Sequence, residues 1–216
     1  INEEKNKLNK VAFTRDFKNF NISDIIMSHF DEKIELSGKI TEDQNKDLKL
    51  NFTEVDLTKI TPRIDSLSLA GNVNGRLNIK QNLGAYIPVS NVTIDNFKVN
   101  NINLGSFKTK IEGNNSLSNY NVDISLKEDD NESLAVKGNL DFSGNNSTIN
   151  LSVNLDKFIL NPLNPFGEGV ITNIRGEVSG NALVTGNLKR PQINGNLILD
   201  GGGLKIPYLN IDYSFE

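Results

Sequence analysis

Apolar and polar residues alternate with a period of two along most of this chain. Residues 48–52 read LKLNF and residues 148–155 read TINLSVNL, so every second side chain is Leu, Ile, Val or Phe. This period predicts β-strands that each carry one apolar face. The residues expected to line that face are Leu48, Leu50, Phe52, Leu77, Ile79, Val92, Ile94, Val122, Ile124, Leu126, Leu134, Val136, Ile149, Leu151, Val153, Leu155, Leu197, Leu199, Leu204, Ile206, Leu209 and Ile211.

Short Gly, Asn and Asp clusters separate the strands and predict hairpin turns. At five or six residues a strand, about a dozen and a half strands are expected. The alternation slips between Ile94 and Phe97, and again between Ile206 and Leu209, and each slip predicts a β-bulge. The clusters read as turns are Asn114 and Asn115, Asp129 to Asn131, Gly144 to Asn146, and Gly201 to Gly203.

Helix signals are weak. The best candidate is residues 21–30, where Ser23 could cap the segment IIMSHF, but ISDIIM also fits a strand. We expect an all-β protein.

An internal repeat is visible at a spacing of about 100 residues. GNVNG at 71–75 matches GEVSG at 176–180, and ELSGKI around Gly38 matches AVKGNL around Gly138. We predict leading strands over 1–34, then two tandem copies in one continuous sheet over 35–216. The copies span about 35–135 and 136–216, and the second is truncated. Repeats without a clear boundary favour one sheet over two closed domains.

Composition excludes several classes of protein. The net charge is −4 and no Lys/Arg cluster stands out, which argues against nucleic-acid binding. Absence of cysteine excludes disulfides and thiolate metal sites, and no apolar run approaches the roughly 20 residues that span a bilayer. The 34 asparagines suit turns and solvated strand faces.

No catalytic constellation emerges. The single histidine, His29, lacks any partner pattern, so we predict no catalytic residue, metal or cofactor. The acidic pairs at 31–32 and 129–130 fit solvated strand ends better than a paired-carboxylate site. Residues 201–203 precede a strand and not a helix, which excludes a phosphate loop.

The apolar face must be covered by another sheet, by closure into a barrel, or by something that is not protein. No layer of helices is expected. A sheet of some 15 strands curled lengthwise would form an aliphatic trough on the order of 70 Å long. Such a trough suits acyl chains, because each buried methylene contributes roughly 0.8 kcal/mol while a charged headgroup stays in water.

An ordered set of residues marks the second copy: Phe166, Gly176, Gly180, Gly186, Pro191, Gly195, Leu197, Leu199, Gly202, Leu209 and Tyr213. This order resembles the repeat of TamB-type proteins of the AsmA-like superfamily, and the resemblance covers about residues 35–216. Two departures occur in the first copy, where Pro88 lies two residues out of phase and Gln81 stands opposite Gly186. The Asn- and Lys-rich composition is similar to that of Bacteroidetes members.

The resemblance implies an open, strongly curved β-taco sheet in the periplasm of a Gram-negative bacterium. In such proteins an inner-membrane anchor precedes the sheet, and a BamA/TamA-like outer-membrane barrel binds a C-terminal segment. This chain shows neither part and is expected to be an interior piece. The expected function is phospholipid transport toward the outer membrane and support of its biogenesis. The alternatives are a scaffold that pairs its edges with nascent barrel strands, and a structural β-solenoid or sandwich stack.

Overall fold

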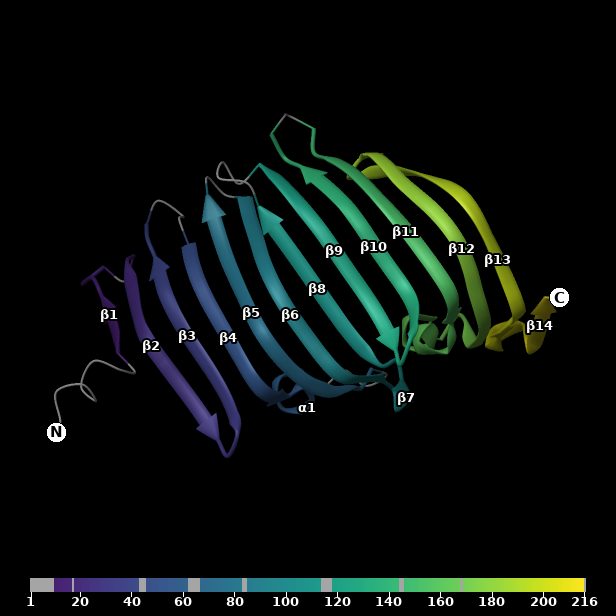
Figure 1. Ribbon diagram of the computed structural model, residues 1–216, viewed down its shortest axis with the longest axis horizontal. Helices are drawn as coiled ribbons and strands as arrows, with labels where there is room; N and C mark the ends of the chain where they lie inside the picture. The colour runs from purple at the N-terminus through teal and green to yellow at the C-terminus, as the bar shows by residue number, and fades with distance from the viewer. Residues whose placement is uncertain are drawn as a thin grey trace.

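The computed structural model describes residues 10–16, 18–42, 46–61, 67–82, 85–113, 118–143, 146–167 and 169–215, and only the backbone of Phe13 and of residues 81–82 and 85–88. These residues form one 14-stranded antiparallel sheet in which successive strands pair side by side (Figure 1). The strands are β1 (Val11–Phe13), β2 (Phe20–His29), β3 (Glu32–Ile40), β4 (Lys46–Asp56), β5 (Leu69–Asn82), β6 (Ala85–Val99), β7 (Ile102–Asn103), β8 (Ser106–Gly113), β9 (Asn119–Glu128), β10 (Asn131–Asp141), β11 (Thr148–Ile159), β12 (Thr172–Asn187), β13 (Arg190–Ile206) and β14 (Ile211–Phe215).

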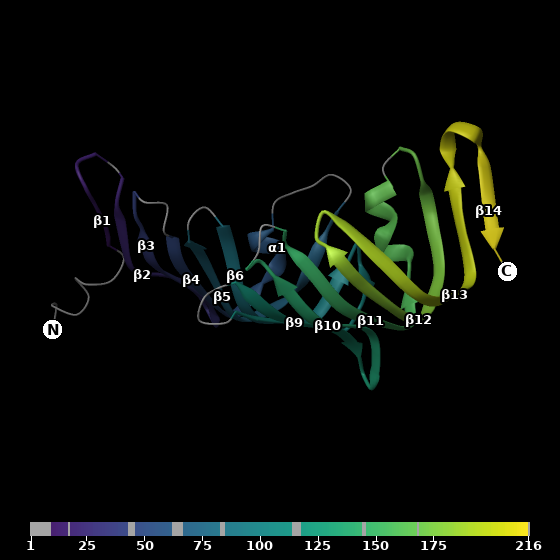
Figure 2. The same cartoon turned by 90° about the horizontal axis from the view of Figure 1, so that it is seen from above.

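The sheet is open, because β1 pairs only with β2 and β14 pairs only with β13 among the described strands. β7 is a short addition that pairs with the end of β6. Seen from above, the strands curve into a trough, with α1 (Leu57–Ile60) and the coiled ribbon of η1 (Asn161–Gly167) rising on its hollow side (Figure 2). The predicted all-β, open and curved sheet is therefore confirmed.

Inward-facing glycines mark the bends. Gly38, Gly75, Gly138 and Gly180 have φ angles between +123° and +152°, which L side chains rarely adopt. A Cβ added at any of them would lie 2.0–2.1 Å from a carbonyl oxygen of the next strand. These glycines let adjacent strands approach while the sheet curls, so the curvature depends on them.

Residues with φ near +50° shift the register. Glu54 in β4 and Lys157 in β11 lie at bulges, and each precedes a short helix. Asn96 produces the bulge predicted between Ile94 and Phe97. Gly201, at φ +57°, occupies the same kind of position within β13. The prediction of a turn at residues 201–203 is therefore wrong: the strand runs through them, because a bulge absorbs the positive φ angle.

The helices lie where none was predicted. Residues 20–29 form strand β2, so the best helix candidate is a strand, which was the alternative for ISDIIM. α1 begins after Asp56, whose carboxylate accepts the Thr58 N–H at 2.9 Å. The slip beside Pro207 is a 3-10 turn, η2 (Pro207–Leu209), and not a bulge. The turn at residues 129–130 is present; Asn114, Asn115 and Gly144 lie outside the described residues.

Backbone features recur at the spacing of the sequence repeat. Gly38 and Gly138 each lie against a carbonyl oxygen of the next strand. Glu54 and Lys157 each precede a connection to the next strand that contains a short helix. The sheet continues through residues 135 and 136 within β10, without interruption. The division into copies at 35–135 and 136–216 stays a prediction, and part of the 1–34 segment lies outside the described residues.

Candidate functional site: the inner face of the sheet

Register places the predicted apolar residues in rows that cross the whole sheet. Direct cross-strand partners point to the same face, so each row can be followed from strand to strand. The central row runs from β3 to β13 through Leu36, Leu50, Leu77, Ser90, Ile111, Val122, Gly138, Leu151, Val184 and Ile193. We call the face that carries this row the inner face.

Parallel rows on either side hold most of the other predicted residues. One row contains Leu48, Ile79 and Ile149. Leu199 lies in a separate short row, in which Phe158 pairs with Val178 and Val178 pairs with Leu199. A second row contains Phe52, Val92, Ile124, Val136 and Val153, and a third contains Ile94, Leu126, Leu134, Leu155 and Leu197.

The last four predicted residues lie at the C-terminal end. Leu204 pairs with Tyr213 and Ile206 with Ile211, whereas Leu209 belongs to η2 and is half exposed. The sheet thus brings most of the predicted set onto one surface. Whether that surface binds lipid stays a prediction.

Protein covers the part of the inner face near α1. Leu57 of α1 is buried together with Val55 and Val73. The predicted residues Phe52, Val92 and Ile94 pack against this cluster and therefore face protein. The sequence suggested an uncovered face here, because nothing marked residues 57–60 as a helix that folds back.

A second cluster continues this cover toward η1. Val99, Leu104 and Leu126 are buried, and Leu134 and Phe158 pack against them. In η1, Pro162 and Pro165 are buried, and the Asn164 side chain ties the segment to β12 through the Ile174 N–H (2.7 Å) and C=O (2.9 Å). The strand ends next to α1, β7, η1 and η2 form what we call the lower rim, which is the lower edge in Figure 1.

The inner face is open elsewhere. Leu48, Leu50, Leu77, Ile79, Ile149 and Leu151 are intermediate in exposure, with no cluster of buried side chains over them among the described residues. On β13, Ile193 is 68% exposed and Leu197 52% exposed. The opposite edge of the sheet, where β3 ends and β4 begins, is what we call the upper rim.

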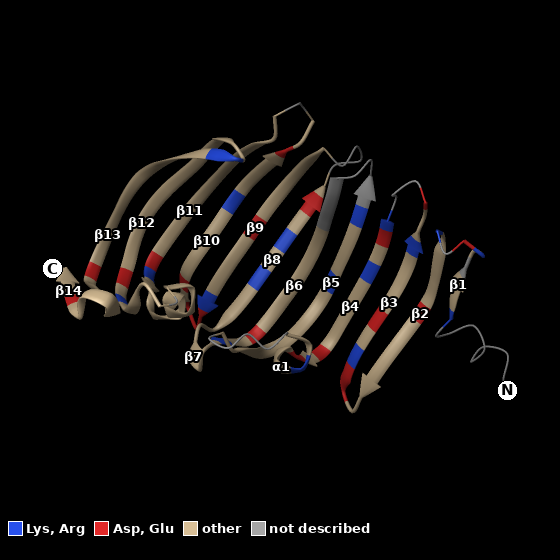
Figure 3. Cartoon of the chain, turned by 180° about the vertical axis from the view of Figure 1, so that it is seen from behind, with Lys and Arg blue, Asp and Glu red and all other residues tan. Residues whose placement is uncertain are grey.

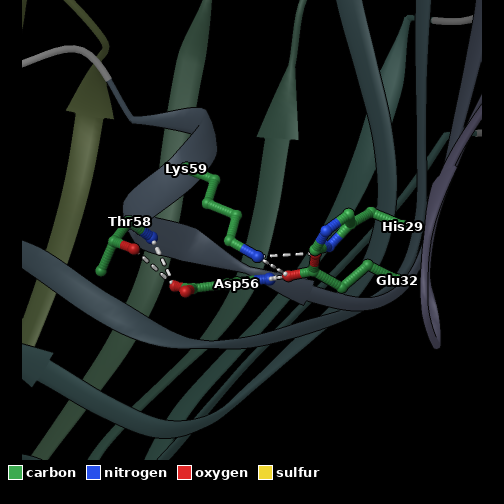
Figure 4. A network of polar contacts seen from close by, with 5 residues as sticks. All are labelled: His29, Glu32, Asp56, Thr58 and Lys59. Carbon is green, nitrogen blue, oxygen red and sulfur yellow. Dashed lines mark hydrogen bonds and ion pairs between the residues drawn. The ribbon is translucent and has the colours of Figure 1, made fainter.

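A polar network holds α1 against the β2–β3 hairpin (Figure 4). Lys59 Nζ donates to both Glu32 carboxylate oxygens, at 2.9 and 2.7 Å, and the Asp56 N–H donates to Oε1 at 3.1 Å. His29 Nδ1 lies 3.3 Å from Oε2. The Lys59 hydrogen bond, aided by the Asp56 N–H, lowers the pKa of Glu32. Glu32 was expected at a solvated strand end, and its partner lies 27 residues away in sequence.

Beneath this network lies a small apolar pocket of about 150 Å³. Met27, Ile34, Val55 and Ile60 supply apolar walls, and Glu32, His29 and Lys59 lie at its margin. Met27 pairs directly with Ile34 on the inner face, so the pocket opens onto the trough. Sequence reasoning missed it, because α1 supplies one wall.

Among the described residues, two that are buried on the inner face carry hydroxyl groups. Ser90 is 6% exposed in the central row, and its Oγ has no hydrogen-bond partner among the described protein atoms. Tyr120 stacks edge-on against Phe142 at 5.7 Å, and burial raises the pKa of its phenol to about 12. Alternation alone did not reveal that either hydroxyl would be buried.

The outer face is polar. One outer row reads Arg76, Asn91, Lys110, Asp123, Lys137 and Ser152 across successive strands. Figure 3 marks charged residues along most of the strands, and few along β11 to β13. The two faces thus differ as alternation predicts.

Catalytic chemistry finds no support among the described residues. No group of His, Asp and Glu there could hold a metal ion. His29 is exposed and contacts Glu32 and the Phe30 ring. In the described part of the chain, no helix is long and apolar enough to cross a membrane.

An open, curved antiparallel sheet with an apolar inner face defines a class of trough-like β-proteins. The chain belongs to the TamB family, because the model for the TamB N-terminal domain matches residues 9–199. The family places it among envelope proteins of Gram-negative bacteria. Neither the comparison with curated proteins nor that with solved structures returned a match. The interior position of this segment and a Bacteroidetes origin stay predictions.

Proposed function

We propose that the inner face binds phospholipid acyl chains and forms part of a periplasmic path that carries phospholipids from the inner to the outer membrane. One observation carries this proposal: apolar rows run from β3 to β13 on one face, and no second sheet of described residues covers them. Ten buried methylenes would contribute about 8 kcal/mol before ordering costs. Docking to a BamA/TamA-like barrel would belong to parts of the full-length protein outside this chain.

Leu151→Asp tests the proposal. Leu151 lies in the open part of the central row, so a carboxylate there would meet the passing chains. Native mass spectrometry of the purified wild-type protein should detect bound phospholipid, and the variant should retain at least fivefold less.

Ser152→Asp is the matched control, because Ser152 is exposed on the outer face of the same strand. It should keep wild-type lipid content. Circular dichroism should show that both variants fold. A wild-type protein without phospholipid, or a Leu151→Asp variant that unfolds because this site is a closed core, would contradict the proposal.

The second candidate is a scaffold for outer-membrane protein assembly. β14 pairs with β13 only over residues 202–206, so residues 190–201 have no neighbour on that side among the described strands. Such an edge can accept an added strand. A strand peptide from an outer-membrane barrel should then protect β13 amides from hydrogen exchange without displacing lipid. Unchanged exchange in β13 at saturating peptide would exclude this function.

A further inference from the structure

We infer that a bound phospholipid has a fixed orientation across the trough, with its anionic headgroup at the upper rim and its acyl chains toward the lower rim. This inference rests on the proposed function and specifies where the lipid lies in the groove. Two independent observations carry it: the lower rim is closed by protein, and the two rims differ in charge.

The connections that follow β4 and β11 close the lower rim. α1 buries Leu57 over β4 and β5, and η1 buries Pro162 and Pro165 next to β12. Between them, Leu104 is 7% exposed in the second cluster. A headgroup can keep its water only at a rim that is not covered, because burying a phosphate without partners is very costly. Among the described residues, no cluster of buried side chains covers the upper rim.

The distribution of charged residues also distinguishes the two rims, because the lower rim is the more acidic. Acidic residues recur at the lower strand ends, visible as red bands along that edge in Figure 3. Two cations there are already paired: Lys59 binds Glu32, and Arg175 lies 2.7 Å from Asp212. Among the described residues, the acids at this rim are Asp31, Glu32, Glu54, Asp56, Asp95, Glu128, Asp129, Asp130, Glu132, Asp156, Glu177, Asp200 and Asp212, and the cations, which are fewer, are Lys33, Lys59, Lys98, Lys127, Lys157, Arg175 and Lys205.

The upper rim carries more cations than anions among its described residues. Its acids are Asp16, Glu42, Asp47, Glu112 and Asp141, of which Glu42 pairs with Lys18 and Glu112 with Lys110. Its basic residues are Arg15, Lys18, Lys39, Lys46, Lys80, Lys110, Lys189 and Arg190. A phosphate is attracted here and repelled at the lower rim.

The apolar pocket under α1 completes the fit. It opens onto the inner face between Met27 and Ile34, at the closed side of the trough. Its volume of about 150 Å³ holds a few methylene groups and no headgroup with its hydration shell. The end of an acyl chain would therefore occupy it, with the phosphate near Lys46, which pairs with Ile40 on the inner face at the upper rim.

Two photoreactive phosphatidylglycerol probes test the orientation on the intact chain. One carries a diazirine on the headgroup and the other at the end of an acyl chain, and mass spectrometry maps each crosslink. We expect the headgroup probe to label the upper rim around Lys39, Lys46 and residues 187–190, and the chain-end probe to label Met27, Ile34 or α1. Headgroup labelling at the lower rim, or equal labelling of both rims, would overturn the inference. If neither probe labels the inner face, the proposed function itself fails.

Charge neutralisation gives a second test. Lys39→Gln, Lys189→Gln and Arg190→Gln together should weaken binding of vesicle-derived phosphatidylglycerol by about fivefold at low salt. The matched lower-rim variant, Lys98→Gln with Lys157→Gln and Lys205→Gln, should change it by less than twofold. Equal losses of phosphatidylglycerol binding in the two variants would show that cations at either rim attract the lipid equally, and would overturn the inference. A larger loss in the lower-rim variant would place the headgroup there.

Discussion

At the scale of single residues, a few backbone positions decide the shape of the trough. Gly138 lies at φ +152°, and a Cβ at this position would lie 2.0 Å from the Asn150 oxygen. Gly201 differs, because its φ is +57° and nothing lies within 4 Å of the place that a Cβ would take. At position 138, only glycine leaves room for the close approach of the neighbouring strand. At position 201, the positive φ angle favours glycine, but asparagine also adopts it.

Gly138→Ala should therefore destabilise the protein by at least about 2 kcal/mol in urea unfolding. Gly201→Asn should cost less than about 1 kcal/mol, since Asn96 adopts φ +52° at a similar bulge. Equal losses of unfolding free energy in the two variants would show that the close approach of the Asn150 oxygen is not the reason for glycine at position 138.

At the scale of elements, the hold on α1 depends on the ionised Glu32 carboxylate. Hydrogen bonds from Lys59 and the Asp56 N–H lower the pKa of Glu32 in the folded protein. A group whose folded pKa is lowered stabilises the fold above its unfolded pKa, and this contribution is lost as pH falls through the folded pKa. The hold on α1 should therefore weaken as the pH falls below 4.5, the ordinary pKa of a glutamate.

Amide hydrogen exchange checks this prediction at Thr61, whose N–H donates to the Leu57 oxygen at 3.1 Å. Its protection factor should fall on acidification in the wild-type protein. In Glu32→Gln, protection should be low already at neutral pH and change little with acid. Glu35→Gln is the control, because Glu35 pairs with Lys33 and not with α1. The same loss in that control would mean that the sheet itself opens.

At the scale of the whole molecule, topology produces the difference between the two rims. Strands that pair in chain order place every second connection on the same edge. The long crossings after β4 and β11 both fall on the lower rim, and both carry apolar residues that fold onto the inner face. In the described part of the chain, helical connections therefore cover one side of the trough and not the other, a difference that a uniform sheet of hairpins would not have.

Most of the sheet could be predicted from the sequence. The alternation around Leu50 and Leu151 placed both residues on one face, and the register confirms that placement. The slip near Asn96 also predicted its bulge. Alternation is a local signal, since successive side chains of a strand point to opposite faces whatever the strand pairs with.

Other features needed the folded chain. The contact between Glu32 and Lys59 joins distant residues, and Phe52 is covered because α1 folds back over it. Gly201 could be read as a turn or as a bulge, because both accept a positive φ angle and only strand pairing decides between them.

The sequence by itself determined the class of fold and the apolar and polar faces, because both follow from the period of two and from local turn chemistry. Tertiary structure decided that the sheet stays open, which rim is covered, and where the charges gather. Those properties depend on which strand ends lie on the same edge and on what the crossings bury, and contacts between residues far apart in the chain set both.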